Sequence, residues 1–133
     1  MVYSRVSAVL VLLASSTAAA AQAVQSNPGQ QIASTNTGSV WYLDRATLRT
    51  SGRVTSAWLT MDHSRDRTEP ARQSRALIEI ECAAHRYHWV QFFSYRRNGA
   101  QMPQRVQPNV IIDIVPGSPI EAVARGICQG GGS

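Results

Sequence analysis

The sequence predicts an α+β domain: a small antiparallel β-sheet with a C-terminal helix packed on one face and joined to it by a disulfide. Stretches rich in β-branched and aromatic residues recur between residues 40 and 95, and one helical pattern follows at residues 118–128. Each of these regions holds one of the two cysteines. At 133 residues and 44% hydrophobic composition, the chain is long enough for one core and too short for two.

Four stretches have the composition of strands, at residues 40–43, 53–61, 75–82 and 87–95. The third alternates clearly, with Ile78, Ile80 and Cys82 on one face and Glu79 and Glu81 on the other. Residues 62–74 are densely charged and contain Pro70, so we expect an exposed connection there.

The strongest turn signal is Asn98-Gly99, a dipeptide typical of β-hairpins. We therefore expect residues 100–106 to return as a strand, at an edge of the sheet because Pro103 lacks a backbone N–H.

The predicted helix begins at Ser118, a capping residue, followed by Pro119 at the first helical position and Glu121 at the third. Its apolar stripe consists of Ile120, Val123, Ala124, Ile127 and Cys128. Gly130 is expected to end it, leaving residues 130–133 as a flexible tail. One short helix cannot cover a whole sheet, so the opposite face is expected to carry apolar rings that need a cover.

Residues 1–23 have the three parts of a secretory signal peptide. Arg5 precedes the apolar residues 6–14, and Ala21-Gln22-Ala23 forms a cleavage site. We expect an exported protein, periplasmic or secreted, with residues 24–38 as a flexible leader. No cysteine precedes Cys82, which argues against a lipid anchor. All thirteen basic residues are Arg and the net charge is +5, but export argues against a nucleic-acid partner.

An even cysteine count in an exported chain favours one disulfide, between Cys82 and Cys128. The alternative is a redox or metal-binding thiol, because His85 and His88 follow in a C-x-x-H-x-x-H pattern. On a strand His85 would point away from the other two, so the three could not converge without a bulge.

Two sets of residues are candidate binding surfaces. A partner or dimer surface is predicted from Tyr87, Trp89, Phe93 and Tyr95, with ordinary core packing as the alternative. An anion- or partner-binding cluster is predicted from Arg96, Arg97, Arg86 and Arg105, with a solvated turn as the alternative.

No catalytic, metal or cofactor site is predicted. Glu79 and Glu81 would lie about 7 Å apart on one strand face, where exposure to solvent is the simpler interpretation. His63 has no identifiable partner, and no hydrolase, zinc-protease, P-loop or dinucleotide motif occurs. We therefore expect a protein that is not an enzyme.

Several motifs together resemble the surface-adhesin protein E family of Gram-negative bacteria. They include the run at residues 40–44, Glu81-Cys82, Asn98-Gly99, Pro116-Gly117-Ser118 and Ile127-Cys128. The resemblance covers about residues 39–128, and the domain is expected to span residues 39–129. It implies an antiparallel sheet with a C-terminal helix, a disulfide between the two cysteines, and self-association. A member of this family is an outer-membrane lipoprotein that binds host matrix and plasma proteins.

These observations predict an exported, non-enzymatic binding module that forms a homodimer. Its predicted partner is a host matrix or plasma protein, or an envelope polymer such as lipopolysaccharide. The alternative is a periplasmic structural or envelope-maintenance domain with no host role. A small enzyme or metal carrier that uses His85 and His88 is a third class.

Overall fold

A computed structural model of the chain describes residues 28–104 and 106–130. The predicted signal peptide (1–23), the start of the predicted leader (24–27), Arg105 and residues 131–133 lie outside the described residues.

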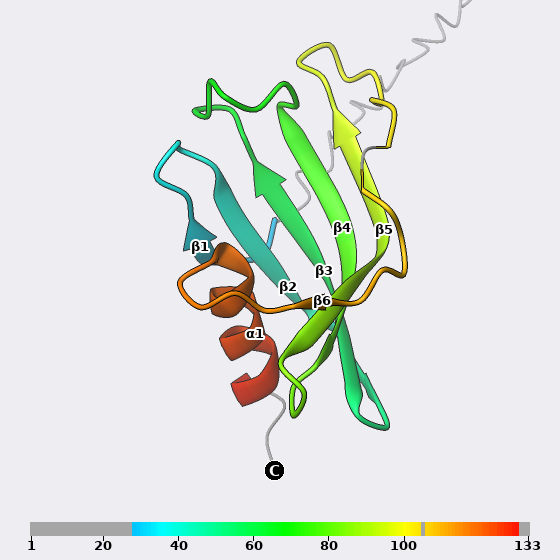
Figure 1. Ribbon diagram of the computed structural model, residues 1–133. Helices are drawn as coiled ribbons and strands as arrows, with labels where there is room; N and C mark the ends of the chain where they lie inside the picture. Colours follow the sequence, from blue (N-terminus) through cyan, green and yellow to red (C-terminus); the bar gives the residue numbers. More distant parts are fainter. Residues whose placement is uncertain (1–27, 105, 131–133) are drawn as a thin grey trace, which may run out of the picture.

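The described chain forms one six-stranded antiparallel sheet and a C-terminal helix (Figure 1). Each strand pairs with the next one along the chain, in the order β1-β2-β3-β4-β5-β6. The elements are β1 (Gln30–Ser34), β2 (Val40–Ser51), β3 (Val54–Asp62), β4 (Gln73–Glu81), β5 (Arg86–Tyr95), β6 (Ile112–Asp113) and α1 (Pro119–Gly130). The predicted fold class is confirmed.

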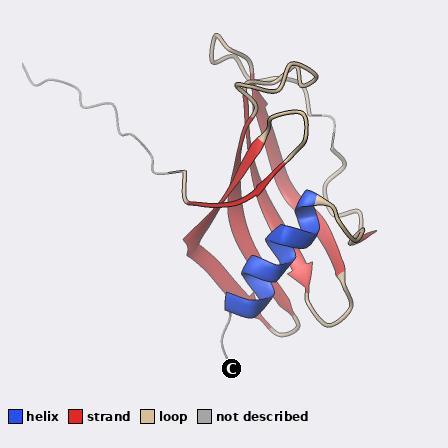
Figure 2. Ribbon diagram, turned by 90° about the vertical axis from the view of Figure 1, so that its left-hand side faces the viewer, coloured by secondary structure: helices blue, strands red, loops and turns tan. Residues whose placement is uncertain are grey.

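The core lies between the helix and one face of the curled sheet, which we call the inner face (Figure 2). Strands β3 and β4 alternate strictly between buried and partly exposed residues. The fully buried side chains from the sheet include Leu43, Leu59, Ile78 and Ile80, and those from the helix are Val123 and Ile127. The hydrophobic stripe predicted for the helix is therefore the face that packs on the sheet.

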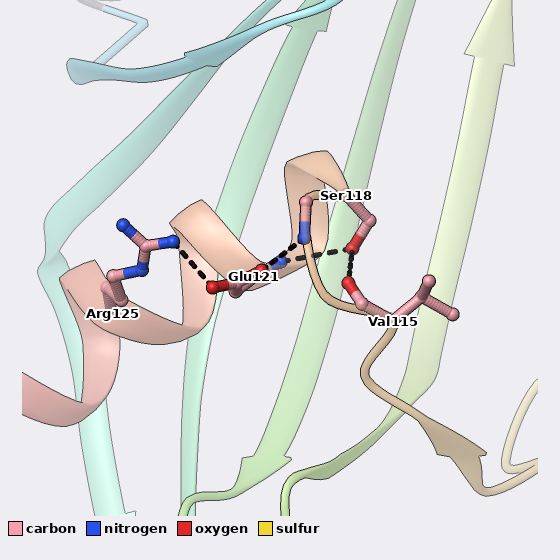
Figure 3. A network of polar contacts seen from close by, with 5 residues as sticks. Val115, Ser118, Glu121 and Arg125 are labelled. Atoms are coloured by element: carbon pink, nitrogen blue, oxygen red, sulfur yellow. Dashed lines mark hydrogen bonds and ion pairs between the residues drawn. The ribbon is translucent and has the colours of Figure 1, made fainter.

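The start of α1 is held by the predicted capping residues (Figure 3). The Ser118 hydroxyl accepts a hydrogen bond from the Glu121 N–H at 3.3 Å. The Glu121 carboxylate in turn accepts from the Gly117 N–H and from Arg125 at 2.5 Å. Both hydrogen bonds lower the pKa of the Glu121 carboxyl, and the bond from the Gly117 N–H has the larger effect.

The helix lies close to the sheet at Gly126. A Cβ atom at this position would lie 2.1 Å from Cδ1 of Ile32 and 3.5 Å from Cδ2 of Leu43. Any larger residue would push against Ile32 in β1, so glycine lets the helix lie close to the first two strands.

The predicted disulfide is present. Cys82 directly follows β4, Cys128 lies in the last turn of α1, and their Cα atoms are 5.8 Å apart. The bond joins the end of the helix to the end of a central strand.

Two strand boundaries differ from the prediction. Residues 30–34, expected in a flexible leader, form β1 and pair with β2. Strand β2 also continues past Asp44 to Ser51 instead of ending there, because an irregularity between Asp44 and Arg49 lets it rejoin β3. Both regions are polar and have only a weak intrinsic preference for β-structure. They form strands because they pair with a neighbouring strand.

The strand expected at residues 100–106 does not form. The Asn98-Gly99 turn is present, but pairing ends after the Tyr95–Gln101 bridge and the bond from the Met102 N–H to the Ser94 carbonyl at 2.8 Å. Pro103 cannot donate to a strand ladder, which explains the early end. The sixth strand is instead Ile112–Asp113, which pairs with the opposite end of β5.

Candidate functional site

The face of the sheet opposite the helix carries a cluster of aromatic side chains. Each member either alternates along its strand with buried core residues or pairs with a residue of the neighbouring strand that alternates in this way. The aromatic members are half-buried, and Arg75, which lies among them, is exposed. We call this cluster the outer aromatic face; it consists of Tyr42, Trp58, Arg75, Phe93 and Tyr95. In the described part of the chain the one helix packs on the other face, so these rings have no helical cover.

Strand register brings these residues together. Thr60 pairs with Tyr42 on one side and Arg75 on the other, and Arg75 pairs with Phe93, which makes one row across four strands. The Arg75 guanidinium carbon lies 5.2 Å from the centre of the Trp58 ring, in a cation–π contact. The cluster therefore combines aromatic surface with a positive charge.

The predicted aromatic surface on β5 is divided between the two faces of the sheet. Ile78 pairs with Trp89 and Leu77 with Gln91, so Val90 is left as a bulge in β5. Before the bulge, Tyr87 and Trp89 point inward and belong to the core or pack against it. After it, Phe93 and Tyr95 point outward. The prediction that all four share one face was wrong, because one extra residue reverses the alternation.

The predicted arginine cluster forms in part. Arg96 and Arg97 are exposed at the end of β5, where they line a shallow depression of about 380 Å³ together with Arg72 and Tyr95. Arg72 was not predicted; its backbone N–H bonds to the Tyr95 carbonyl at 2.8 Å. The depression adjoins the outer aromatic face through Tyr95, their shared residue.

Arg86 does not belong to this cluster. It is the first residue of β5 and lies about 30 Å from the other end, at a strand rise of about 3.3 Å per residue. It pairs with Glu81 at 3.1 Å. Arg105 lies outside the described residues. The prediction of a four-arginine cluster was therefore wrong in placing Arg86 near Arg96 and Arg97.

The histidine pattern after Cys82 does not converge. Cys82 is bonded to Cys128, His85 lies in the β4–β5 turn with a positive φ of 52°, and His88 pairs with Glu79 at 3.0 Å. Within residues 28–104 and 106–130, no three His, Cys, Asp or Glu side chains are grouped to hold a metal ion.

A buried polar network around His63 was missed by sequence reasoning. His63 and Asp66 are each 8% exposed, although the whole segment was expected to be an exposed connection. His63 Nδ1 lies 2.8 Å from the Ser39 hydroxyl, and Nε2 lies 3.1 Å from that of Ser74. Ser39 donates to the Asp66 carboxylate at 2.6 Å. No local signal could have found it, because the partners come from three separate segments.

The charges of the network follow from its contacts. Hydrogen bonds from Ser39, Thr37 and Thr68 hold the pKa of Asp66 well below its usual range. Burial lowers the pKa of His63, although nearby carboxylates oppose this effect. Asp66 is therefore ionised and His63 neutral at pH 7.

The order Ser74–His63–Ser39–Asp66 resembles a nucleophile, a base and an orienting acid, with an extra serine between the last two. Ser74 is only 2% exposed, and its hydroxyl also contacts Ser94 at 2.9 Å. We interpret the network as a polar tie between the β3–β4 loop and the sheet.

The profile of the family described as "Surface-adhesin protein E" matches residues 30–129. This chain belongs to the surface-adhesin protein E family. The matched region runs from the first residue of β1 into the last turn of α1, so the protein E-like adhesin domain includes β1.

Solved structures of protein E from Haemophilus influenzae have the same fold. One matches with a TM-score of 0.55 and 15% identity, over 80% of this chain and 87% of the other. A second crystal form matches with a TM-score of 0.53 and 17% identity, over 68% and 80% of the two chains. A comparison with curated proteins gave no match. In the part of this protein E-like chain that the structure describes, no helix is long and apolar enough to cross a membrane.

Proposed function

We propose that this chain is an exported, non-enzymatic binding module that holds a protein partner on its outer aromatic face. The composition of that face carries the proposal, because Trp, Tyr and Arg dominate the binding energy of protein interfaces. Trp58, Tyr42 and Tyr95 lie there beside Arg75, opposite the helix. Membership of a surface-adhesin family supports the same function, and the predicted signal peptide supports export.

The adjoining arginines indicate the charge of the partner. Arg72, Arg96 and Arg97 surround the depression beside Tyr95, and three guanidinium groups favour an acidic segment. A host matrix or plasma protein with such a segment fits the family. An anionic envelope polymer is the competing partner, and it would be held by charge alone.

We also infer that the module is a homodimer, as predicted from the family resemblance. The support for this inference is membership of the family, because the outer aromatic face is assigned above to the protein partner. Light scattering of the purified protein tests this inference, with twice the chain mass as the expected result and the chain mass as the contradicting one.

The binding test uses oxidised protein purified after export and a panel of matrix proteins, plasma proteins and lipopolysaccharide. We expect saturable binding to a matrix or plasma protein. Trp58→Ala and the pair Arg96→Ala/Arg97→Ala should each weaken it by about tenfold or more.

The matched control is the pair Arg49→Ala/Arg53→Ala, which removes the same charge near the β2–β3 turn at the opposite end of the sheet. This control should bind like the wild type. Binding to every anionic surface, abolished by salt, would contradict the proposal and leave the basic charge as a general property. Absence of any binding, with the protein enclosed inside intact cells, would favour the periplasmic structural domain.

A further inference from the structure

The helix leaves part of the inner face uncovered. Helix α1 contacts β1, β2 and β3, and beyond it the inner face borders a pocket of about 520 Å³. The pocket lies between the β3–β4 loop and the segment that follows β5, the two loops at the top of Figure 1. Its apolar walls include Trp41, Trp89, Phe92 and Met102.

The aromatic walls are held in place before any ligand arrives. The Trp89 and Phe92 rings pack edge to face, with centroids 5.2 Å apart and planes at 82°. The Tyr87 and Trp89 rings also pack edge to face, with centroids 5.7 Å apart and planes at 83°. Trp89 is 7% exposed, so its ring is fixed by the core. Walls of this kind suit a flat aromatic ligand.

The polar end of the pocket has a defined hydrogen-bond direction. The Asp66 carboxylate can only accept, so the Ser39 hydroxyl donates to it and must accept from Nδ1–H of His63. Since burial lowers the pKa of His63 and keeps its ring neutral, Nε2 accepts from Ser74. Ser74 has then used its hydrogen and accepts from Ser94 at 2.9 Å.

The chain of donors therefore ends at Ser94, which lines the pocket. Its hydrogen is directed toward Ser74, so toward a ligand its oxygen can only accept. Glu69, also at the pocket, presents a carboxylate, which likewise accepts.

We propose that this pocket binds a small aromatic compound that carries an N–H or O–H donor and no negative charge. The ring of the compound lies against Trp89 and Phe92, and its donor group bonds to the Ser94 oxygen. The outer aromatic face lies on the other side of the sheet, so this site is independent of the proposed protein-binding function.

Three closely matched fluorescent probes test the proposal on the wild-type protein. N-phenyl-1-naphthylamine has the aromatic body and one N–H donor, its N-methyl derivative lacks the donor, and 8-anilinonaphthalene-1-sulfonate adds a negative charge. We expect N-phenyl-1-naphthylamine to bind about five- to tenfold more tightly than the N-methyl derivative, the effect of one hydrogen bond. The sulfonate should bind more weakly still. Equal affinities for all three, or tightest binding of the sulfonate, would overturn the proposal.

Two serine variants locate the site. Ser94→Ala should remove the preference for the N–H probe over its N-methyl derivative. Ser56→Ala, the same change on the opposite face of the sheet, should preserve it. Circular dichroism checks that both variants fold, and a preference that survives in folded Ser94→Ala would also refute the assignment. Saturating probe should leave binding to a protein partner on the outer aromatic face unchanged, which separates the two functions.

Discussion

At the scale of single residues, His63 is held through both nitrogens of its ring. Both ring nitrogens have hydroxyl partners, and the ring is buried behind the β3–β4 loop. Sequence reasoning placed it in an exposed charged segment, because nothing within a few residues of it shows what it contacts. Its partners Ser39 and Ser74 reach it only when β2, β3 and β4 are paired.

The first prediction concerns the pH dependence of stability. Because burial lowers the pKa of His63, the unfolded chain binds this proton more readily than the folded protein. The contribution of neutral His63 to stability is complete above the ordinary pKa of about 6.5 and is lost as the pH falls below it.

The free energy of unfolding should therefore decline from pH 6.5 downward, with a slope of at most about 1.4 kcal/mol per pH unit for this one proton. His63→Gln, which takes up no proton, should be less stable at pH 7 but show a flatter profile in urea titrations between about pH 5 and pH 7. His88→Gln on the outer face is the control. A profile for His63→Gln as steep as the wild type's would show that His63 does not titrate in this way.

At the scale of elements, the bulge at Val90 decides what each face of the sheet presents. It sends Phe92 to the core and Phe93 to the outer aromatic face, although strict alternation from Trp89 predicts the reverse. The same bulge lets one strand supply both a wall of the inner pocket and a ring of the outer face. A single inserted residue thus connects core packing with both proposed binding sites.

The second prediction compares the two neighbouring phenylalanines. Phe92→Ala should destabilise the fold by about 2–3 kcal/mol, because Phe92 packs against the core and Trp89. Phe93→Ala should cost less than about 1 kcal/mol while weakening partner binding. Chemical denaturation of both variants measures this difference. Equal losses, or a larger loss for Phe93→Ala, would contradict the assignment of faces.

At the scale of the whole molecule, the disulfide and the close contact at Gly126 fix the C-terminal part of the helix to two different strands of the sheet. Cys128 is bonded beside the end of β4, while Gly126 lies against Ile32 in β1. The helix thus spans strands that are distant in sequence and covers one part of the inner face. The remainder of that face is left open as the pocket.

The third prediction is that Cys128→Ala lowers the free energy of unfolding by about 4 kcal/mol, the chain-entropy value for a bridge between cysteines 46 residues apart. The double variant Cys82→Ala/Cys128→Ala should lose about the same amount, since both variants lack the same bond. Denaturant titrations of oxidised protein and both variants measure the loss. Stability equal to the wild type's would mean that the bond does not constrain the unfolded chain.

The amino-acid sequence by itself determined the α+β class, the helix with its cap and buried stripe, the faces of the third predicted strand and the disulfide. These depend on local periodicity, turn chemistry and cysteine count, which a linear pattern records. Of the candidate site it identified Phe93, Tyr95, Arg96 and Arg97. Only the tertiary structure decided that Tyr87 and Trp89 turn inward, that Trp58 and Arg72 join the site, and that His63 has buried partners. Those features depend on strand register and on contacts between distant segments, and one bulge is enough to reverse a face that local alternation predicts.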